Sequence, residues 1–239
     1  MADDNLSDYV VRHLVEHIRQ NRLQSGAVMP SELRVASELQ VSRGIVREAY
    51  RSLKMAGILD VSNGRAPRVG HLNNNYFCQT VKHALSTQQV SVEQVLELRS
   101  SVEVCAAGFA AARRTESHVA TLMKQVESMH SATRNRERFV KADLQFHQTI
   151  GEASGNPLYE LLVTSLRQSL EASIRVGLDS RTSYNELHRI NETHLKIADA
   201  IAAKDSSRAE KYMTAHFEEA RAAILKAGTR NPSRAAMRA

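Results

Sequence analysis

Four residues in the C-terminal half of the chain have the side-chain types and the spacing of ligands to a divalent metal ion. Asp143 and His147 are four residues apart, which places them on one face of a helix. His194 and His216 each lie about ten residues from a polar break at 204–207, so antiparallel helices joined there would bring the two imidazoles face to face. One carboxylate and three imidazoles suit Zn²⁺ best, with Ni²⁺ or Mn²⁺ as alternatives. Because the chain contains ten histidines, ordinary surface or hydrogen-bonded histidines are the competing interpretation.

The segments that must position these residues have the apolar period of helices. From about residue 79 to 228, apolar side chains recur at helical spacing, and no stretch of useful length shows the alternation of a strand. Six or so helices predict an all-α bundle with room for a pocket between the helices. The expected helices cover Val92–Arg113, His118–Thr133, Glu137–Ala153, Leu158–Gly177, Ser183–Ala203 and Ser207–Ala227.

The first seventy or so residues follow a different order, namely helix, helix, turn, helix and hairpin. Apolar periodicity indicates a first helix over about 6–20, Ser31 is a candidate N-cap of a second helix, and Ser42 caps a third that ends near Gly57. The asparagine-glycine pair within 62–65 predicts a hairpin turn between two short strands. This order predicts a winged helix-turn-helix. The fold class is therefore mainly α, with three helices and a small β-hairpin wing preceding the all-α bundle.

These patterns divide the chain into four segments. We expect a winged helix-turn-helix over 1–72, a polar linker over 73–79 and the helical domain over 80–228. The remaining residues, 229–239, form a basic tail that we expect to be disordered.

Composition excludes several other classes of protein. The 239 residues carry a formal net charge of +6, which is compatible with a nucleic-acid partner without establishing one. No apolar run approaches the length of a membrane span, and the acidic N-terminus lacks the apolar segment of a secretory signal. The two cysteines provide no disulfide framework. A cytoplasmic protein without a membrane partner is the expectation.

The helix-turn-helix carries the residue types that read DNA. The N-terminal end of its second helix enters the major groove, and here that end has Arg43 and Arg47 at i and i+4 on one face. Arginine reads guanine through two hydrogen bonds, although any one exposed arginine taken alone is more often simply solvated. An arginine at the tip of the wing suits the minor groove. The expected DNA contacts are Arg34, Ser42, Arg43, Arg47, Asn63, Gly64 and Arg65.

Several of these motifs resemble a known family. Pro30-Ser31-Glu32, Val41-Ser42-Arg43, Val46-Arg47-Glu48-Ala49 and the Gly57-Ile58-Leu59…Gly64 wing together resemble the GntR superfamily of bacterial transcription regulators. The C-terminal motifs Asp143-x-x-Phe146-His147, Gly155-Asn156-Pro157, Glu192-x-His194 and Met213-x-x-His216 are similar to the FCD ligand-binding domain of the FadR subfamily.

The resemblance implies roles for particular residues. In metal-binding members the matching aspartate and three histidines hold the metal, which assigns that role to Asp143, His147, His194 and His216. The acyl-CoA-binding type does not keep this site, so a fatty acyl effector is disfavoured. Arg99 matches an arginine that faces the cavity and suits a carboxylate effector, and a salt bridge with Glu103 one turn on is the alternative.

Together these observations predict a transcription regulator rather than an enzyme. We expect a homodimer on a palindromic DNA operator, because two-fold protein symmetry requires a two-fold site. A small organic or sugar acid at the metal would control binding, with repression the expected mode. The alternatives are a regulator that responds to the metal itself, a helical metal-dependent enzyme and a constitutive architectural DNA-binding protein.

Overall fold

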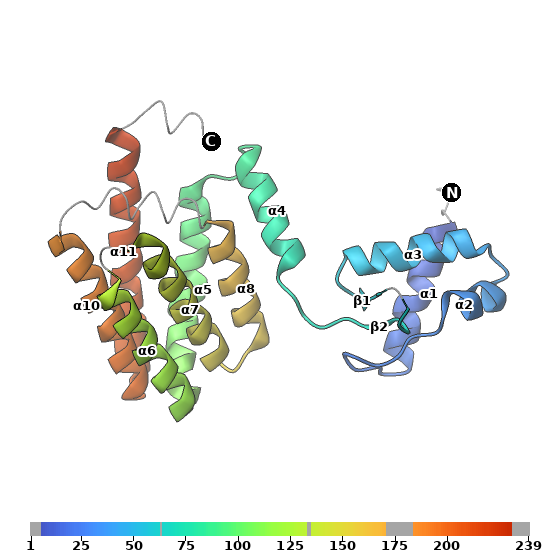
Figure 1. The fold of residues 1–239 in the computed structure, drawn as a ribbon, viewed down its shortest axis with the longest axis horizontal. Helices are drawn as coiled ribbons and strands as arrows, with labels where there is room; N and C mark the ends of the chain where they lie inside the picture. The colour runs from blue at the N-terminus through green and yellow to red at the C-terminus, as the bar shows by residue number, and fades with distance from the viewer. Residues whose placement is uncertain (1–5, 63, 133–134, 171–183, 231–239) are drawn as a thin grey trace. The chain divides into compact units, whose positions relative to one another are not determined.

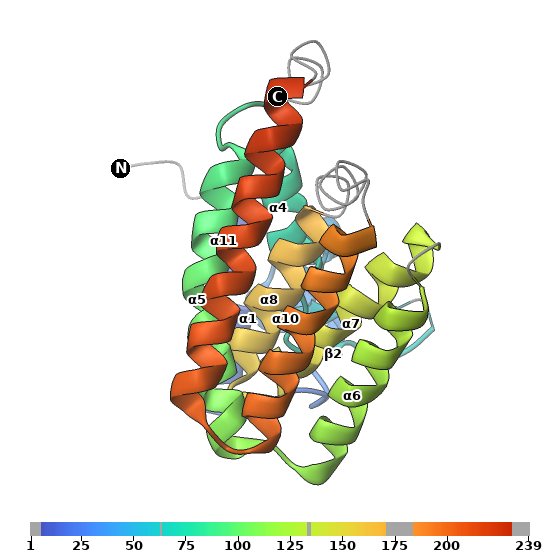
Figure 2. The same ribbon diagram turned by 90° about the vertical axis from the view of Figure 1, so that its left-hand side faces the viewer.

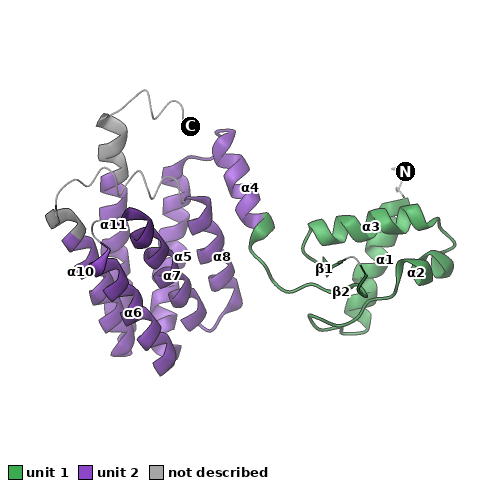
Figure 3. Ribbon diagram, viewed as in Figure 1, with its two compact units in different colours: residues 1–76 green, residues 77–239 purple. Residues whose placement is uncertain are grey.

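The computed structural model describes residues 6–62, 64–132, 135–170 and 184–230 (Figure 1). The chain divides into two compact units, 1–76 and 77–239 (Figure 3). Each unit has its own hydrophobic core. Within the described ranges, no helix combines the length and the apolar character needed to cross a membrane.

The N-terminal unit is the expected winged helix-turn-helix. It contains α1 (Leu6–Gln20), α2 (Glu32–Leu39) and α3 (Arg43–Met55). The Ser31 side chain accepts a hydrogen bond from the backbone N–H of Arg34 at the start of α2, and Ser42 accepts one from Ile45 at the start of α3. These caps satisfy backbone donors that the first turn of a helix leaves without partners. The unit's core contains Val10, Leu14, Val35, Val46, Tyr50 and Leu53.

Two short strands form the wing. β1 (Leu59–Asp60) pairs antiparallel with β2 (Arg68–Val69), with Leu59 opposite Val69. In the turn between them Gly64 has a φ of +74°, a conformation that glycine adopts without steric cost. Asn63, the other half of the predicted turn pair, lies outside the described residues.

The expected linker over 73–79 overlaps a helix, α4 (Asn75–Ser86). The Asn73 side chain accepts a hydrogen bond from the backbone N–H of Asn75 and so supports the first turn. Cys78 is buried, and Val81 and Leu85 pack against the core of the second unit. The sequence did not indicate this helix, because residues 73–75 are polar. The i, i+3, i+7 pattern formed by Cys78, Val81 and Leu85 begins only at Cys78.

The second unit is an all-helical bundle. Its helices are α5 (Val92–Arg113), α6 (Glu116–Ser131), α7 (Arg136–Ala153), α8 (Pro157–Ser169), α10 (Tyr184–Ala202) and α11 (Ser206–Arg230). α5 packs against α7, α8, α10 and α11, and the two views in Figures 1 and 2 show α5 and α11 side by side. This arrangement brings α5, α7, α10 and α11 around one interior region, which is where the predicted metal ligands lie.

Two expected boundaries differ from the structure or fall outside it. α11 continues to Arg230, so the first two residues of the predicted disordered tail are helical, and 231–239 lie outside the described residues. The helix expected over Leu158–Gly177 is described as α8 up to Ser169, and 171–177 lie outside the described residues.

Two helical glycines predict opposite responses to alanine. A Cβ at Gly151 would lie 2.9 Å from the backbone Cα of Glu160 at the start of α8, so one of the two helices must shift. A Cβ at Gly108 would meet only the side chain of Glu210, which is exposed and whose carboxylate end lies nearest, so the side chain can move aside. We therefore expect Gly151→Ala to lower the free energy of unfolding by about 1–2 kcal/mol through overpacking.

Gly108→Ala is the matched control within the same bundle. Alanine's better helix propensity should leave this variant as stable as the parent, or up to about 1 kcal/mol more stable. Urea denaturation followed by circular dichroism measures both. Equal destabilisation by the two substitutions would contradict the close approach of α7 and α8.

Candidate metal centre and DNA-binding surface

Three histidines from three helices meet inside the bundle. His147 lies on α7, His194 on α10 and His216 on α11, and one ring nitrogen from each lies within 4.8 Å of the others. The ring centroids of His194 and His216 are 4.7 Å apart, so the two imidazoles face each other across the α10–α11 turn as the spacing predicts.

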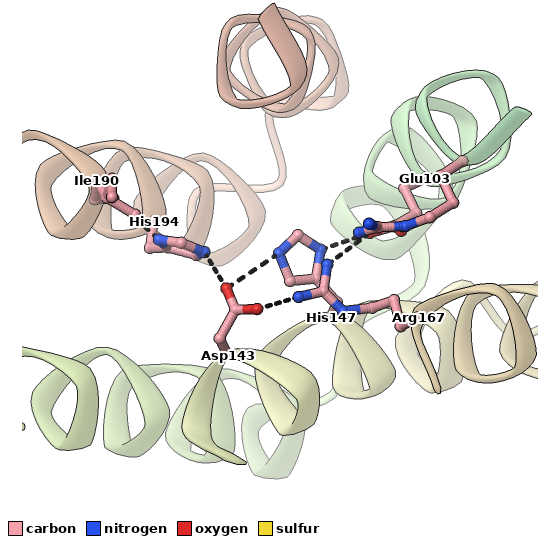
Figure 4. Close-up of polar contacts among 7 residues, drawn as sticks. Glu103, Asp143, His147, Arg167, Ile190 and His194 are labelled. Carbon is pink, nitrogen blue, oxygen red and sulfur yellow. Dashed lines mark hydrogen bonds and ion pairs between the residues drawn. The ribbon is translucent and has the colours of Figure 1, made fainter. Parts of the chain in front are cut away.

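A hydrogen bond in one ring and a close polar contact in another determine which nitrogen each ring turns toward the centre. His194 donates from Nδ1 to the backbone carbonyl of Ile190 at 2.8 Å. His147 Nδ1 lies 2.5 Å from Oε2 of Glu103 on α5 (Figure 4). Because both Nδ1 atoms carry the proton in these contacts, both Nε2 atoms of the neutral rings present lone pairs. An outer carboxylate or carbonyl that orients a histidine in this way is typical of metal ligands.

Asp143 faces these same lone pairs. Its Oδ1 lies 3.0 Å from Nε2 of His194 and 3.8 Å from Nε2 of His147 (Figure 4). A carboxylate oxygen and two imidazole lone pairs all accept hydrogen bonds, so they repel unless a cation or an additional proton lies among them. Neither Nε2 atom has a hydrogen-bond partner in the described part of the chain. The residues present therefore fit a divalent ion.

Two buried arginines hold the acidic groups in place. Arg167 on α8 pairs through Nη2 with Oδ2 of Asp143, and its Nη1 lies 3.6 Å from Oε2 of Glu103. Arg99 on α5 donates from Nε to Oε1 of Glu103 at 2.9 Å. Arg99, Glu103, Asp143 and Arg167 are each 5% exposed or less. Pairing between opposite charges is what makes such deep burial of four ionised groups tolerable.

The same neighbours set the protonation states. Burial alone would raise the pKa of Asp143, but the adjacent charge of Arg167 holds that pKa well below its usual value. Burial, with Arg167 adding to it, lowers the pKa of His147 to about 4. Burial, followed by His194 and His147, lowers the pKa of His216 well below its ordinary value. At neutral pH, Asp143 is thus ionised and these two imidazoles are neutral, which are the forms that bind metal.

The predicted DNA-contacting residues that the structure describes are exposed on the N-terminal unit. Arg43 and Arg47 lie on one exposed face of α3, whose first turn contains no acidic residue. Arg47 Nε lies 3.5 Å from Oε2 of Glu32 on α2, while Arg34 pairs with Glu38 at 2.7 Å. Ser42, Gly64 and Arg65 are also exposed. The structure therefore leaves these side chains accessible to a ligand.

Comparisons with known proteins match both halves of the chain. Residues 6–69 match the gntR family of bacterial regulatory proteins, and residues 94–219 match the FCD domain. The HTH-type transcriptional regulator LutR of Bacillus subtilis (strain 168) is 30% identical over 204 residues, which cover 84% of this chain and 92% of LutR. The chain belongs to the GntR family.

Other relatives agree with this assignment. The HTH-type transcriptional repressor NanR of Salmonella schwarzengrund (strain CVM19633) is 26% identical over 220 residues, covering 91% of this chain and 83% of NanR. The solved structure of Streptococcus agalactiae GntR has the same fold, with a TM-score of 0.66 and 24% identity over 90% of this chain and 99% of that one. As a GntR-family member of the FadR-like type, the chain is a DNA-binding transcription regulator with a C-terminal ligand-binding domain, and it is not an enzyme.

Some residues of the site in this GntR-family regulator were not predicted from the sequence. Arg167 was missed, although it occupies an apolar position between Val163 and Leu170, where a charge is unusual without a partner. Asn191, one turn before His194 on α10, is buried, and neither amide atom has a partner among the described residues. Arg99 makes the alternative contact, the salt bridge with Glu103, and its guanidinium lies 5.2 Å from the Phe217 ring.

The lowered pKa of His147 predicts that the metal-free protein loses stability in mild acid. Below a pH of about 6.5 the unfolded chain binds a proton at this histidine, whereas the folded chain does so only near pH 4. The free energy of unfolding should therefore fall as the pH drops from about 6.5 to 4, by about 3 kcal/mol from this residue alone. Urea denaturation of chelator-treated protein at several pH values measures the slope.

Two variants separate this histidine from the others. His147→Asn should reduce the slope and leave the part that comes from His216, while His130→Asn, which removes an exposed histidine from α6, should leave the slope unchanged. A free energy of unfolding that stays constant across this pH range would contradict a buried, neutral His147.

Proposed function

We propose that this regulator is a repressor whose operator binding is controlled by a small carboxylate effector held at a divalent metal ion. Asp143, His147, His194 and His216 would hold the metal. The observation that carries the proposal is the contact of Asp143 Oδ1 with His194 Nε2, two acceptor atoms 3.0 Å apart in a buried site. A bound divalent ion would supply a Lewis-acidic centre on which a carboxylate is oriented.

The ligand set favours Zn²⁺ among the divalent ions. Neutral imidazole nitrogens and one carboxylate are its common donors, and Ni²⁺ or Mn²⁺ are the alternatives. Glu103 and the Ile190 carbonyl hold two of the rings with Nε2 toward the centre, so little reorganisation is needed to bind an ion.

Arg99 is proposed as an effector contact. Its Nε donates a hydrogen bond to Glu103, but a guanidinium has four further N–H groups that can donate to a carboxylate. Because Glu103 also contacts His147, an effector that touches Arg99 would be linked through one carboxylate to a metal ligand. That link offers a physical route from effector binding to the arrangement of α5 and α7.

For the DNA-binding unit we propose a homodimer on a palindromic operator, in the cytoplasm. α3 would enter the major groove, where Arg43 and Arg47 contact bases and Ser42 contacts a phosphate. Arg34 would reach the backbone or a base, and the wing residues Asn63, Gly64 and Arg65 would approach the minor groove. The word repressor in the name of the relative NanR supports repression as the mode of action.

Metal content tests the C-terminal half of the proposal. Freshly purified protein should carry about one divalent metal per subunit, and a His194→Ala/His216→Ala double variant should carry none because it loses two of the four ligands. Elemental analysis with circular dichroism as a folding check makes the measurement. His118→Ala/His130→Ala, two histidines of α6 outside the site, is the matched control and should keep its metal.

Protein that contains no metal and takes none up on titration would contradict this half of the proposal. Release of operator by chelator or excess metal, with no response to any organic acid, would instead indicate a regulator that senses the metal itself.

Operator binding tests the N-terminal half. After an operator has been selected from a random DNA pool, Arg43→Ala and Arg47→Ala should each weaken binding about ten- to a hundred-fold through loss of base contacts. Arg19→Ala removes the same charge from exposed α1, where Arg19 pairs with Glu16, and should bind with nearly unchanged affinity. Fluorescence anisotropy at fixed salt measures all three. Unchanged binding by both α3 variants would reject the assigned recognition surface.

A further inference from the structure

The charges buried in the FCD domain balance before any metal is added. In the described part of the domain, the almost fully buried charged side chains are Arg99, Arg167, Glu103 and Asp143. Two positive and two negative groups sum to zero, and all four belong to one connected cluster. Since an uncompensated charge is costly to bury, this balance means that the cluster carries no net charge before a metal binds.

A divalent metal changes that balance by two positive charges. The imidazoles add no charge of their own, because a histidine binds a metal ion through the lone pair of its neutral ring. A monocarboxylate effector would leave one positive charge uncompensated in the buried cluster. A dicarboxylate would restore neutrality, so the electrostatics of the metal-loaded site favour an effector with two acidic groups.

Arg167 is the donor best placed to take the second acidic group. Its Nη2 is occupied by Asp143, but its Nε has no acceptor within the described ranges, and its Nη1 is 3.6 Å from Glu103, too far for a hydrogen bond. Arg99, in comparison, already directs its Nε to Glu103. The unpartnered donors of Arg167 also lie on the guanidinium that touches a proposed metal ligand, which places them next to the ion.

We propose that the effector of this regulator is a dianion, with one carboxylate on the metal and the second on the guanidinium of Arg167. This inference rests on the proposed function, in which a carboxylate effector binds at the metal site. It assigns Arg167 as a residue that determines specificity, because the arginine distinguishes a second carboxylate from a neutral group of the same shape.

Matched pairs of ligands test the charge requirement on the unmodified protein. Full-length protein loaded with one equivalent of Zn²⁺, and freed of unbound metal by gel filtration, is titrated calorimetrically with malonate, succinate, glutarate and adipate. Each diacid is compared with its monoamide, which has nearly the same shape and one charge fewer. At least one diacid should bind about ten- to a hundred-fold more tightly than its monoamide.

Substitution of Arg167 tests the assignment of the second anchor. Arg167→Lys keeps the positive charge but loses the paired N–H donors of the guanidinium. It should reduce the ratio of diacid affinity to monoamide affinity about tenfold or more. Arg189→Lys, on the exposed side of α10, is the matched control and should keep the preference. Thermal shift with each ligand gives a second readout, since a ligand that binds the folded state raises the melting temperature.

Failure of the dianion proposal and failure of the proposed function give different results. Monoamides that bind as tightly as every diacid would overturn the dianion and leave a carboxylate effector standing. A diacid preference that persists in Arg167→Lys would overturn the role of Arg167. If no carboxylate of either kind binds or releases operator, the proposed function itself fails. Should Arg167→Lys not fold, Arg167→Gln takes its place, and the comparison on the unmodified protein decides the charge requirement without either variant.

Discussion

The interior of the helical domain is organised around one ionised carboxylate that faces imidazole lone pairs. Oδ2 of Asp143 forms an ion pair with Arg167, and Oδ1 lies close to Nε2 of His194 and of His147. A carboxylate buried this deeply needs a positive charge beside it, and Arg167 supplies that charge. The side of the carboxylate that faces the imidazole lone pairs is suited to a metal ion.

The packing of the bundle follows from this requirement. Glu103 on α5 orients His147 on α7 and contacts both buried arginines, so a single side chain ties α5, α7 and α8 together. His194 lies on α10 and His216 on α11, the two helices of one helical hairpin. Five helices therefore share one polar centre, and a ligand that alters this centre acts on all of them at once. Such a shared element is what a regulator needs, because coupling requires differential contacts in two states.

Local patterns located most of the helices and predicted that the proposed metal ligands lie together, but they did not identify the residues around those ligands. Helical periodicity located α5, α6, α7, α10 and α11, and the i, i+4 spacing with the symmetric hairpin brought Asp143 and three histidines to one place. Arg167 escaped notice because its partners, Asp143 and Glu103, lie on other helices and become neighbours only through packing. The start of α4 was missed because three asparagines precede its apolar face.

Anomalous diffraction from crystals grown with Zn²⁺ would locate the proposed metal centre directly. One strong peak is expected in each subunit, about 2.0–2.2 Å from Nε2 of His147, from Nε2 of His194, from a ring nitrogen of His216 and from a carboxylate oxygen of Asp143. Arg167 should keep its contact with the second oxygen of that carboxylate. A peak bound through Nδ1 of His147 or His194, a peak elsewhere in the domain, or no peak at all would contradict the proposed metal centre.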